Sequence, residues 1–473
     1  MMPAAVLSRT MRRLSTPSTR LSLYNAIAGT GQCNPFATVT GSRSSRRARR
    51  QRRTKPEEDA SKSSSVSSRL SEMREALKLV ANIEDISRNG LTNRVEMPQE
   101  MLNRLTTIVK RRTHSQLIQL REKLQADEAN NDRQIPLDMH KRPLGWTLDK
   151  DEQIKPMLYG PGETMAYLAQ DVEMTYACTH QAFRQLQTRR PDFAPESVLD
   201  FGAGPGTASW VAKEYYGDSL SRYRVLEPSQ SMVDAAEVLL DGFPGLSIRR
   251  SISEMKREIQ NGLSYDLIVL NFVLSEITSD YERVAIMSAL WELLSDNGVL
   301  VIVDRGSTWG SHQVRSARQF ILDSVADEQD ESAKILAPCP HQEECPAKGK
   351  TWCHFVQRSP RVQFPRDVTT KRWHGHKVSK FSYVVMEKTR DIVEAKPEPL
   401  GRLIRSLTVS VSISSGPLLA NKHVLLDLCM PQGNLERRSV TKGKAIREVY
   451  RAARKAHWGA SWPADASVYL AKK

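Results

Sequence analysis

The chain has 473 residues, which is enough for two or three domains with full-sized hydrophobic cores. Its formal net charge is +15, but residues 1–56 hold twelve Lys and Arg and no Asp or Glu, which leaves about +3 for the rest. The sequence lacks the ~18–20 consecutive apolar residues of a membrane-spanning helix, which argues against an integral membrane protein and predicts a soluble mature form.

Residues 1–56 form a basic leader that is rich in Arg, Ser and Thr. Such a segment is typical of a mitochondrial transit peptide, whereas a secretory signal would need an apolar central region that this segment lacks. A nuclear localisation signal at "RRARRQRR" and a disordered basic tail are the alternatives. We expect import into the mitochondrial matrix, because an amphipathic stretch precedes the basic run. In that reducing compartment clustered cysteines favour metal ligation over disulfide bonds.

Residues 57–190 are predicted to form a helical N-terminal region. Apolar residues recur at helical spacing in "LSEMREALKLVANIEDI" and in "EMLNRLTTIVKRRTHSQLIQLREKL". A Gly/Pro turn at "LYGPGETMAYLAQ" then leads into another apolar-periodic helix, with Thr164 just inside it.

Residues 191–330 are predicted to form an α/β domain. The apolar segments "SVLDFG", "YRVLEP", "LSIRRS", "YDLIVLNFV" and "GVLVIVDRG" read as strands, and most of them are separated by helical segments. This alternation predicts a doubly wound, largely parallel sheet with helices on both faces.

The first strand of this domain runs into a glycine-rich turn, "VLDFGAGPGTASWVA". Glycines let the backbone pass close to a ligand, and the helix that follows offers free N–H groups. Glu227 closes the next strand, where a carboxylate can accept both hydroxyls of a ribose. The candidate cofactor-binding residues are Asp200, Gly202, Gly204, Gly206 and Glu227.

The D-x-G-x-G-x-G spacing resembles the S-adenosylmethionine loop of class I methyltransferases more than a dinucleotide fingerprint. A tight strand-to-helix turn without a ligand and a nicotinamide site are the alternatives. Support for methyl transfer is weak: Asn271 and Phe272 stand in "NFVLSEI", where base-amine methyltransferases carry an Asn/Asp-Pro-Pro-aromatic loop, and both prolines are missing. Residues 197–305 also lack the cysteine that cytosine-carbon methylation needs. We therefore name no catalytic residue.

Three of the six cysteines lie within "CPHQEECPAKGKTWCHF". Cys339, Cys345 and Cys353 are widely spaced, and Cys429 follows far downstream. Four thiolates in a reducing compartment indicate zinc or an iron–sulfur cluster. The wide spacing favours the cluster, while His341 and His354 keep a mixed Cys/His zinc site open, and unrelated buried thiols are the third alternative. Cys33 belongs to the leader, and Cys178 is expected in the core.

Residues 331–473 are predicted to form a cysteine loop followed by a small strand-rich, basic domain. Strands are expected at "KFSYVVMEK", "LTVSVSIS" and "HVLLDLC", and a basic helix at "KGKAIREVYRAARKAHW". The basic residues of "RRSVTKGKAIREVYRAARKAHW" and the basic and aromatic residues of "QRSPRVQFPRDVTTKRWHGHK" favour contacts with RNA phosphates. A solvated basic face is the alternative for each segment.

Taken together, these motifs resemble the methyltransferase-like assembly proteins of the mitochondrial small ribosomal subunit, a family with bacterial relatives. The resemblance covers about residues 140–460 and rests on "YGPGETMAYLA", "VLDFGAGPGT", "CPHQEECP", "TWCHF" and "LDLCMPQGNLERRSVTKG". It implies a class I methyltransferase-like (Rossmann-like) fold, an S-adenosylmethionine pocket at Gly202, Gly204, Gly206 and Glu227, and a [4Fe–4S] cluster on Cys339, Cys345, Cys353 and Cys429. The region before residue 140 departs from the family.

The resemblance also implies a function in ribosome biogenesis. Proteins of this family are regarded as binding maturing small-subunit rRNA between head and body, and as having largely lost methyl transfer. The expected partners are therefore small-subunit mitochondrial rRNA, ribosomal proteins of the assembling subunit and other assembly factors. An active rRNA methyltransferase that uses Asn271 and a zinc-dependent RNA-binding protein are the competing interpretations.

Overall fold

The computed structural model describes ten segments and several single residues, all within the unit Ala76–Lys473. They are residues 94–109, 157–251, 253–326, 331–347, 352–360, 376–390, 400–409, 423–445, 447–456 and 461–463, with residues 116, 119, 122, 145, 146, 328 and 459. The predicted leader and the first predicted helix, "LSEMREALKLVANIEDI", lie outside the described residues.

Three helices precede the first strand: α3 (Gln99–Val109), α5 (Pro161–Gln170) and α6 (Val172–Arg189). In α3 the buried residues are Met101, Leu105 and Val109, four apart, so they form the apolar stripe that the sequence pattern predicts. Thr164 is buried in the first turn of α5, as expected, and Cys178 is fully buried in α6.

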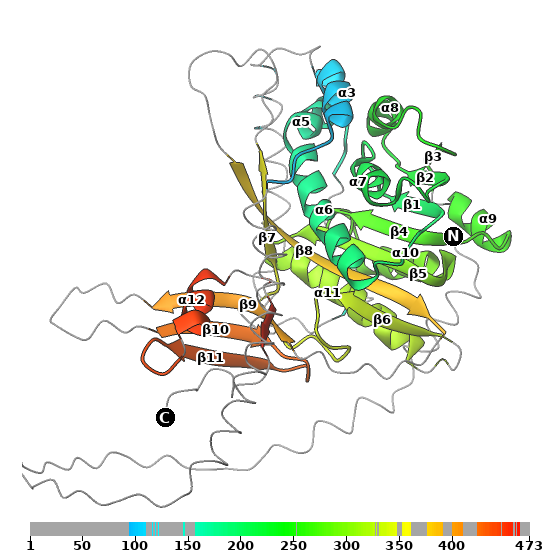
Figure 1. Ribbon diagram of the computed structural model, residues 1–473. Helices are drawn as coiled ribbons and strands as arrows, with labels where there is room; N and C mark the ends of the chain where they lie inside the picture. The colour runs from blue at the N-terminus through cyan, green and yellow to red at the C-terminus, as the bar shows by residue number, and fades with distance from the viewer. Residues whose placement is uncertain are drawn as a thin grey trace, which may run out of the picture. The chain divides into compact units, whose positions relative to one another are not determined.

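The predicted alternation of strands and helices between residues 197 and 325 is confirmed (Figure 1). The elements are β1 (Ser197–Phe201), α7 (Thr207–Tyr216), β2 (Arg222–Leu226), α8 (Gln230–Leu239), β3 (Ser247–Arg249), α9 (Ser253–Gln260), β4 (Tyr265–Asn271), α10 (Asp280–Leu293), β5 (Leu294–Arg305) and α11 (Thr308–Val325).

Strands β1 to β5 are parallel, and three later strands extend the sheet: β6 (Ser332–Ala337), β7 (Phe355–Pro360) and β8 (His376–Thr389). The order is β3-β2-β1-β4-β5-β8-β6, and β8 runs antiparallel to β5, β6 and β7. This doubly wound sheet, with one antiparallel strand inserted beside β5, is the class I methyltransferase-like fold that the sequence predicts.

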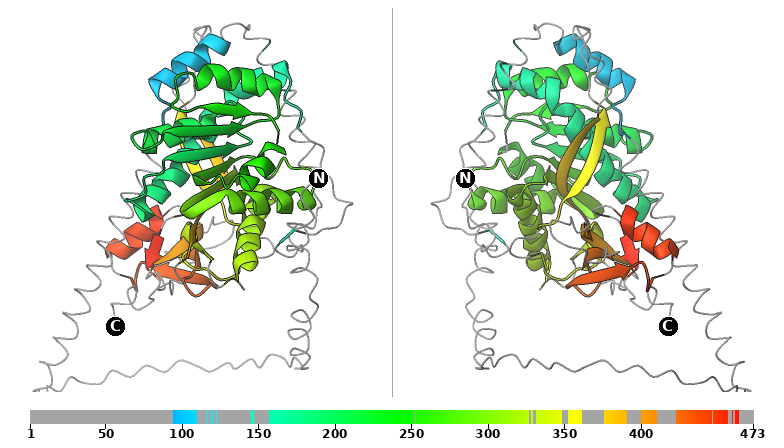
Figure 2. Two further views of the ribbon diagram at one scale, coloured as in Figure 1. Left: turned by 90° about the vertical axis from the view of Figure 1, so that its right-hand side faces the viewer. Right: turned by 90° about the vertical axis from the view of Figure 1, so that its left-hand side faces the viewer.

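The sheet separates two layers of helices, which Figures 1 and 2 show on its two sides. Successive side chains of a strand point to opposite faces. Val299, Val301 and Val303 of β5 share one core cluster with residues of α3, α6, α7 and α8. The intervening residues Leu300 and Ile302 are equally buried but lie outside that cluster, and α10 and α11 contact β5 as well.

A second, four-stranded antiparallel sheet has the order β11-β10-β9-β12. Its elements are β9 (Leu400–Val409), β10 (His423–Cys429), β11 (Leu435–Thr441), α12 (Arg447–Lys455) and β12 (Ser461–Pro463). Val449 and Ala453 of α12 pack on Val424, Leu426 and Val440 of the sheet. The predicted basic helix is therefore confirmed. Residues after 330 supply strands to both sheets, and the predicted domain boundaries stay predictions.

Buried hydrogen bonds fix the loop that follows β4. Asp304, at the end of β5, accepts the N–H and hydroxyl of Ser275 at 2.9 and 2.7 Å. Arg283 of α10 is fully buried and donates to the Leu274 carbonyl at 2.9 Å, to the Ile277 carbonyl and to Asp280. These bonds hold the segment from Asn271 to Glu276 in one conformation.

We predict that Arg283→Met destabilises the protein, because it removes a buried guanidinium that donates to the Leu274 carbonyl, the Ile277 carbonyl and Asp280. A loss of about 3 kcal/mol or more is expected for removing one partner of such a buried network. Urea-induced unfolding measures it. The matched control is Arg257→Met on the exposed side of α9, which should change stability by less than about 0.5 kcal/mol. Equal effects of the two variants would contradict this structural role of Arg283.

Candidate functional site

The candidate cofactor loop lies where the strand order reverses. β1 is paired with β2 on one side and with β4 on the other, and the connections leave in opposite directions from this point. In open parallel sheets, ligands bind at the carboxyl ends of the strands beside such a switch point. The glycine loop, residues 202–206, follows the carboxyl end of β1 directly.

All three glycines of the loop have positive φ angles, +65° at Gly202, +54° at Gly204 and +84° at Gly206. A Cβ on Gly202 would meet Val273 at 2.6 Å, and one on Gly206 would meet Leu240 at 2.5 Å. No larger residue fits at these two positions without displacing Val273 or Leu240. A Cβ on Gly204 would have only Met232 Sδ at 4.0 Å, so this position faces open space.

Asp200 is fully buried at the end of β1. One carboxylate oxygen accepts the N–H and the hydroxyl of Ser209 at 2.9 and 2.8 Å, and the other, Oδ1, has no hydrogen-bond partner among the described residues. Burial raises the pKa of Asp200 to about 6, although the bonds from Ser209 act in the opposite direction. A buried acceptor without a donor is ready to bind a polar or cationic group of a ligand.

Glu227 follows β2 and is also buried. Its carboxylate accepts the N–H of Gly204 and the N–H of Ser229, both at 2.8 Å, and burial raises its pKa. Glu227 is therefore in direct contact with the glycine loop. The sequence predicts that these residues belong to one site, and this contact is consistent with that prediction. Through these two bonds the Glu227 carboxylate links the loop after β1 to the end of β2, and neither bond involves a ligand.

The side chains beside the candidate methyl-transfer position are already engaged. Asn271 Oδ1 accepts the hydroxyl of Thr179 in α6 at 2.6 Å. Phe272 has a left-handed backbone, with φ of +62°, which is strained for a residue with a bulky side chain. The Tyr159 hydroxyl donates to Glu276 at 3.0 Å, and burial raises the pKa of Tyr159.

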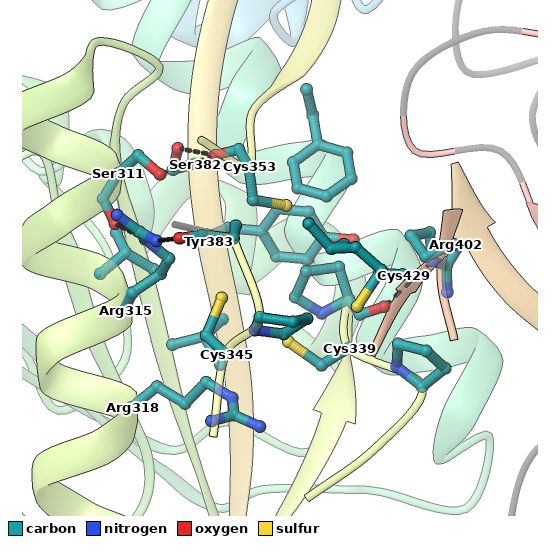
Figure 3. A pocket seen from close by; sticks show the side chains of 18 residues that line it. Ser311, Arg315, Arg318, Cys339, Cys345, Cys353, Ser382, Tyr383, Arg402 and Cys429 are labelled. Carbon is teal, nitrogen blue, oxygen red and sulfur yellow. Dashed lines mark hydrogen bonds between the residues drawn. The ribbon is translucent and has the colours of Figure 1, made fainter. Parts of the chain in front are cut away.

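The four cysteines of the predicted metal site line one cavity (Figure 3). Cys339 follows β6, Cys345 lies in the loop, Cys353 precedes β7, and Cys429 ends β10 of the second sheet. Their sulfur atoms point into the same space. Among the described residues, no group of three or more His, Cys, Asp or Glu is placed to hold a metal ion.

The backbone of the cysteine loop is held by side chains from elsewhere in the fold. Arg318 of α11 donates to the carbonyls of His341 and Glu343 at 3.2 and 2.6 Å, and Arg402 of β9 donates to the Pro338 carbonyl at 3.0 Å. Arg315 donates to the Ala347 carbonyl. These bonds satisfy loop carbonyls that have no strand or helix partner.

Cys353 is fixed in the same way. Its carbonyl accepts the Ser311 hydroxyl of α11 at 2.9 Å and the Ser382 hydroxyl of β8 at 2.7 Å. Trp352 donates to the Gly306 carbonyl at 3.1 Å, and Phe355 packs on Tyr383. With its carbonyl bound to α11 and β8, Cys353 lines the cavity together with the other three cysteines.

Burial raises the pKa of the Cys339, Cys353 and Cys429 thiols, and the neighbouring thiols raise it further. Four thiolates in this position therefore require a cationic occupant. His341 Nε2 lies 3.2 Å from Cys429 Sγ, and burial, assisted by Arg318, lowers the pKa of His341 to about 4. The imidazole is thus neutral and close to one sulfur.

Sequence reasoning missed the three arginines that line the cysteine cavity, Arg315, Arg318 and Arg402. The sequence pattern could have indicated Arg315 and Arg318, because two basic residues three positions apart in a helix lie on the same face. Arg402 carries none in the sequence, because its place beside Cys429 arises from pairing between β9 and β10.

Strand order and site together define a class I methyltransferase-like protein that carries a cysteine-lined cavity beside its sheet. The chain belongs to the family described as "Mitochondrial small ribosomal subunit Rsm22", whose family model matches residues 161–463. The match includes the glycine loop and all four cysteines of the cavity.

Two relatives give the family context. The human protein "Ribosome assembly protein METTL17, mitochondrial" is 28% identical over 311 residues, which cover 64% of this chain and 62% of that protein. "Ribosome assembly protein RSM22, mitochondrial" of Saccharomyces cerevisiae is 21% identical over 431 residues, which cover 65% of this chain and 68% of that protein. The chain thus spans less than two thirds of the length of the human relative.

Solved structures with a similar fold include methyltransferases. The plantazolicin methyltransferase BamL has a TM-score of 0.32 with 13% identity, covering 57% of this chain and 99% of that one. Precorrin-6y C5,15-methyltransferase from Geobacter metallireducens has a TM-score of 0.28 with 12% identity, covering 44% and 85%. The fold itself is defined by the strand order of the main sheet, β3-β2-β1-β4-β5-β8-β6. In the described part of the chain no helix is both long and apolar enough to cross a membrane.

We predict a pH dependence of stability that arises from Asp200. Its pKa is about 6 in the folded protein and 3.8 ordinarily, so the folded state retains the proton more strongly. This contribution is therefore fully present below about pH 4 and is lost as the pH rises through 6. Between pH 5 and 7 the wild type should lose about 1 kcal/mol relative to Asp200→Asn, which has no proton to release. Urea unfolding of both proteins at pH 5, 6 and 7 measures the difference; parallel profiles would contradict it.

Proposed function

We propose that this chain is a mitochondrial assembly factor of the small ribosomal subunit, which binds immature small-subunit rRNA and does not transfer methyl groups. In this proposal it holds a [4Fe–4S] cluster on Cys339, Cys345, Cys353 and Cys429 and binds S-adenosylmethionine at the glycine loop. The observation that carries the proposal is the convergence of four cysteines, distant in sequence, on one cavity in a member of the Rsm22 family.

The cavity supports a cluster over a single zinc ion. Zinc–sulfur bonds of ~2.3 Å would bring four tetrahedral sulfurs to within roughly 4 Å of one another. Here four cysteine thiols from separate segments of the chain line one cavity. An iron–sulfur cubane is larger and is held by four cysteine thiolates, so this donor set fits it.

Three features support S-adenosylmethionine at the glycine loop. The loop lies at the switch point of the sheet, Gly204 faces open space, and Asp200 offers a buried oxygen without a donor. When bound, the cofactor would be held by residues 200–206 and Glu227, the latter through the ribose hydroxyls. Because Asn271 Oδ1 is already bonded to Thr179, methyl transfer has little support.

The second sheet supports contact with RNA phosphates. Arg447, Arg451 and Arg454 are exposed on α12 at positions i, i+4 and i+7, opposite the buried residues Val449 and Ala453. Such a row of cations suits a phosphate backbone. Arg437 and Arg438 contribute less to this surface, because they pair with Asp427 and Glu436. The other predicted basic segment lies largely outside the described residues, at 361–375.

Localisation and partners follow from the relatives. The human and yeast relatives are named as mitochondrial ribosome assembly proteins. For this chain we infer the mitochondrial matrix, where small-subunit rRNA, ribosomal proteins and other assembly factors would be its partners. The basic leader supports import as a transit peptide.

We predict that anaerobically purified protein absorbs near ~400 nm and contains iron and sulfide, as expected for an iron–sulfur protein. Replacing any one of the four cysteines by Ser should abolish or strongly reduce the absorption, because each supplies a ligand. The matched control is Cys178→Ala, a buried cysteine in α6 away from the cavity, which should keep the spectrum. Zinc without iron in the wild type would contradict the cluster.

We predict that Gly204→Ala weakens binding of S-adenosylmethionine at least tenfold, measured by isothermal titration calorimetry. The added methyl group would enter the space that Gly204 leaves open. Gly242→Ala is the matched control, because Gly242 also has a positive φ, +76°, and open surroundings, but lies in an exposed turn. Both variants should lose about 1 kcal/mol of stability from backbone strain; equal affinities would place the cofactor elsewhere.

The same Gly204 variant, combined with Glu227→Gln, separates the proposal from an active rRNA methyltransferase. In the assembly-factor interpretation, rRNA methylation in cells that carry the double variant stays unchanged. Disappearance of one rRNA methyl mark, while subunit assembly proceeds, would support the enzyme instead.

A further inference from the structure

Two arginines of α11 line the cysteine cavity, and the proposed function gives them no role. Arg315 and Arg318 are three residues apart, so they lie on the same side of the helix. Arg318 is only 1% exposed, and Arg315 is half-buried. Figure 3 shows both guanidinium groups on the α11 side of the four sulfurs, with Arg318 below Cys345.

Among the described residues no acid balances the charges of these two arginines. Their hydrogen bonds go to the carbonyls of Ser311, His341, Glu343 and Ala347 and to the Gln319 amide oxygen. In the described part of the chain neither guanidinium forms an ion pair with a carboxylate. Arg318 Nε is buried without a hydrogen-bond partner. Burying a cation in this way is unfavourable unless an anion lies nearby.

The thiols provide that anion only when they are ionised. Arg315 and Arg318 line the same cavity as the four cysteine thiols, so their charges lie beside this group of ligands. Four thiolates on a cubane outweigh the positive charge of the core, so the whole centre is anionic, and one added electron makes it more so. The cavity therefore places arginine cations beside a centre that is anionic once its cationic core and the four thiolates are counted together.

We propose that Arg315 and Arg318 are electrostatic positioning residues of the cluster: their positive charges stabilise the anionic centre and favour its reduced form. The proposal depends on the cluster of the proposed function. Because the reduced centre carries one more negative charge than the oxidised one, a nearby cation stabilises it more and raises its reduction potential. The Met variants, which lack the charge, should therefore be harder to reduce.

The test compares Arg315→Met, Arg318→Met, Arg315→Lys and Arg318→Lys with the wild type. Each full-length protein is purified anaerobically, its iron and sulfide are measured, and the cluster is titrated with dithionite as the electron donor. The midpoint potential is read from the visible absorption and the electron paramagnetic resonance signal. Arg257→Met on exposed α9 is the control for loss of a positive charge far from the cavity.

We expect each Met variant to shift the one-electron equilibrium at least tenfold toward the oxidised form, which corresponds to ~59 mV. The Lys variants should remain close to the wild type, because they keep the charge. If the Met variants fold but lose the cluster while the Lys variants keep it, the result would also support a stabilising role of the two positive charges. Met and Lys variants that behave alike would overturn it. Absence of iron from the wild type would instead contradict the proposed function itself.

Discussion

The hydrogen bonds between buried guanidinium groups and the carbonyls of the cysteine loop are the interaction on which the candidate metal site depends. Residues 338–347 form neither strand nor helix, so their carbonyls lack the partners that regular structure supplies. Arg318 and Arg315 reach them from α11, and Arg402 reaches them from β9. One loop is thereby tied to the main sheet's helix layer and to the second sheet, and its thiols are turned toward one cavity.

At the other site, the glycine loop, the binding residues have structural partners of their own. Glu227 bonds the N–H groups of Gly204 and Ser229, and Asp200 bonds Ser209. These bonds stabilise the loop without any ligand. The loop geometry can therefore persist in a protein that does not catalyse methyl transfer. For this reason the glycine loop by itself is weak evidence for methyl-transfer activity. The hydrogen bond that Asn271 accepts from Thr179 is the more informative observation.

Much of the fold could be predicted from the sequence because its signals are local. The strands between residues 197 and 305 are apolar runs bounded by turns, and α12 combines a basic face with Val449 and Ala453. The insertion of β8 between β5 and β6 could not be predicted, because it depends on pairs such as Val301 with Val385, far apart in the chain. Local patterns carry no information on such pairing.

The candidate metal site likewise has features that the sequence predicts and features that it does not. The clustering of Cys339, Cys345 and Cys353 and the family resemblance, which adds Cys429, predicted the four cysteines, but not what surrounds them. Arg402 and Cys429 are neighbours only because β9 and β10 pair in a particular register. A buried cation is also hard to recognise from composition, because Arg is usually exposed. Residues whose role depends on register and burial, rather than on motif, are the ones that sequence reasoning misses.

The end of β5 connects the two sites physically. Asp304 holds Ser275 in the loop after β4, and two residues later the Gly306 carbonyl accepts the indole of Trp352, beside Cys353. A Cβ on Gly306 would meet the backbone of β8 at 2.6 Å, so this crossing is tightly packed. The cysteine loop thus lies against the carboxyl end of β5, next to the strand ends where such sheets bind their ligands. Within three residues, Asp304 therefore binds the loop after β4 and Gly306 binds the cysteine loop, so the two loops share one short support at the end of β5.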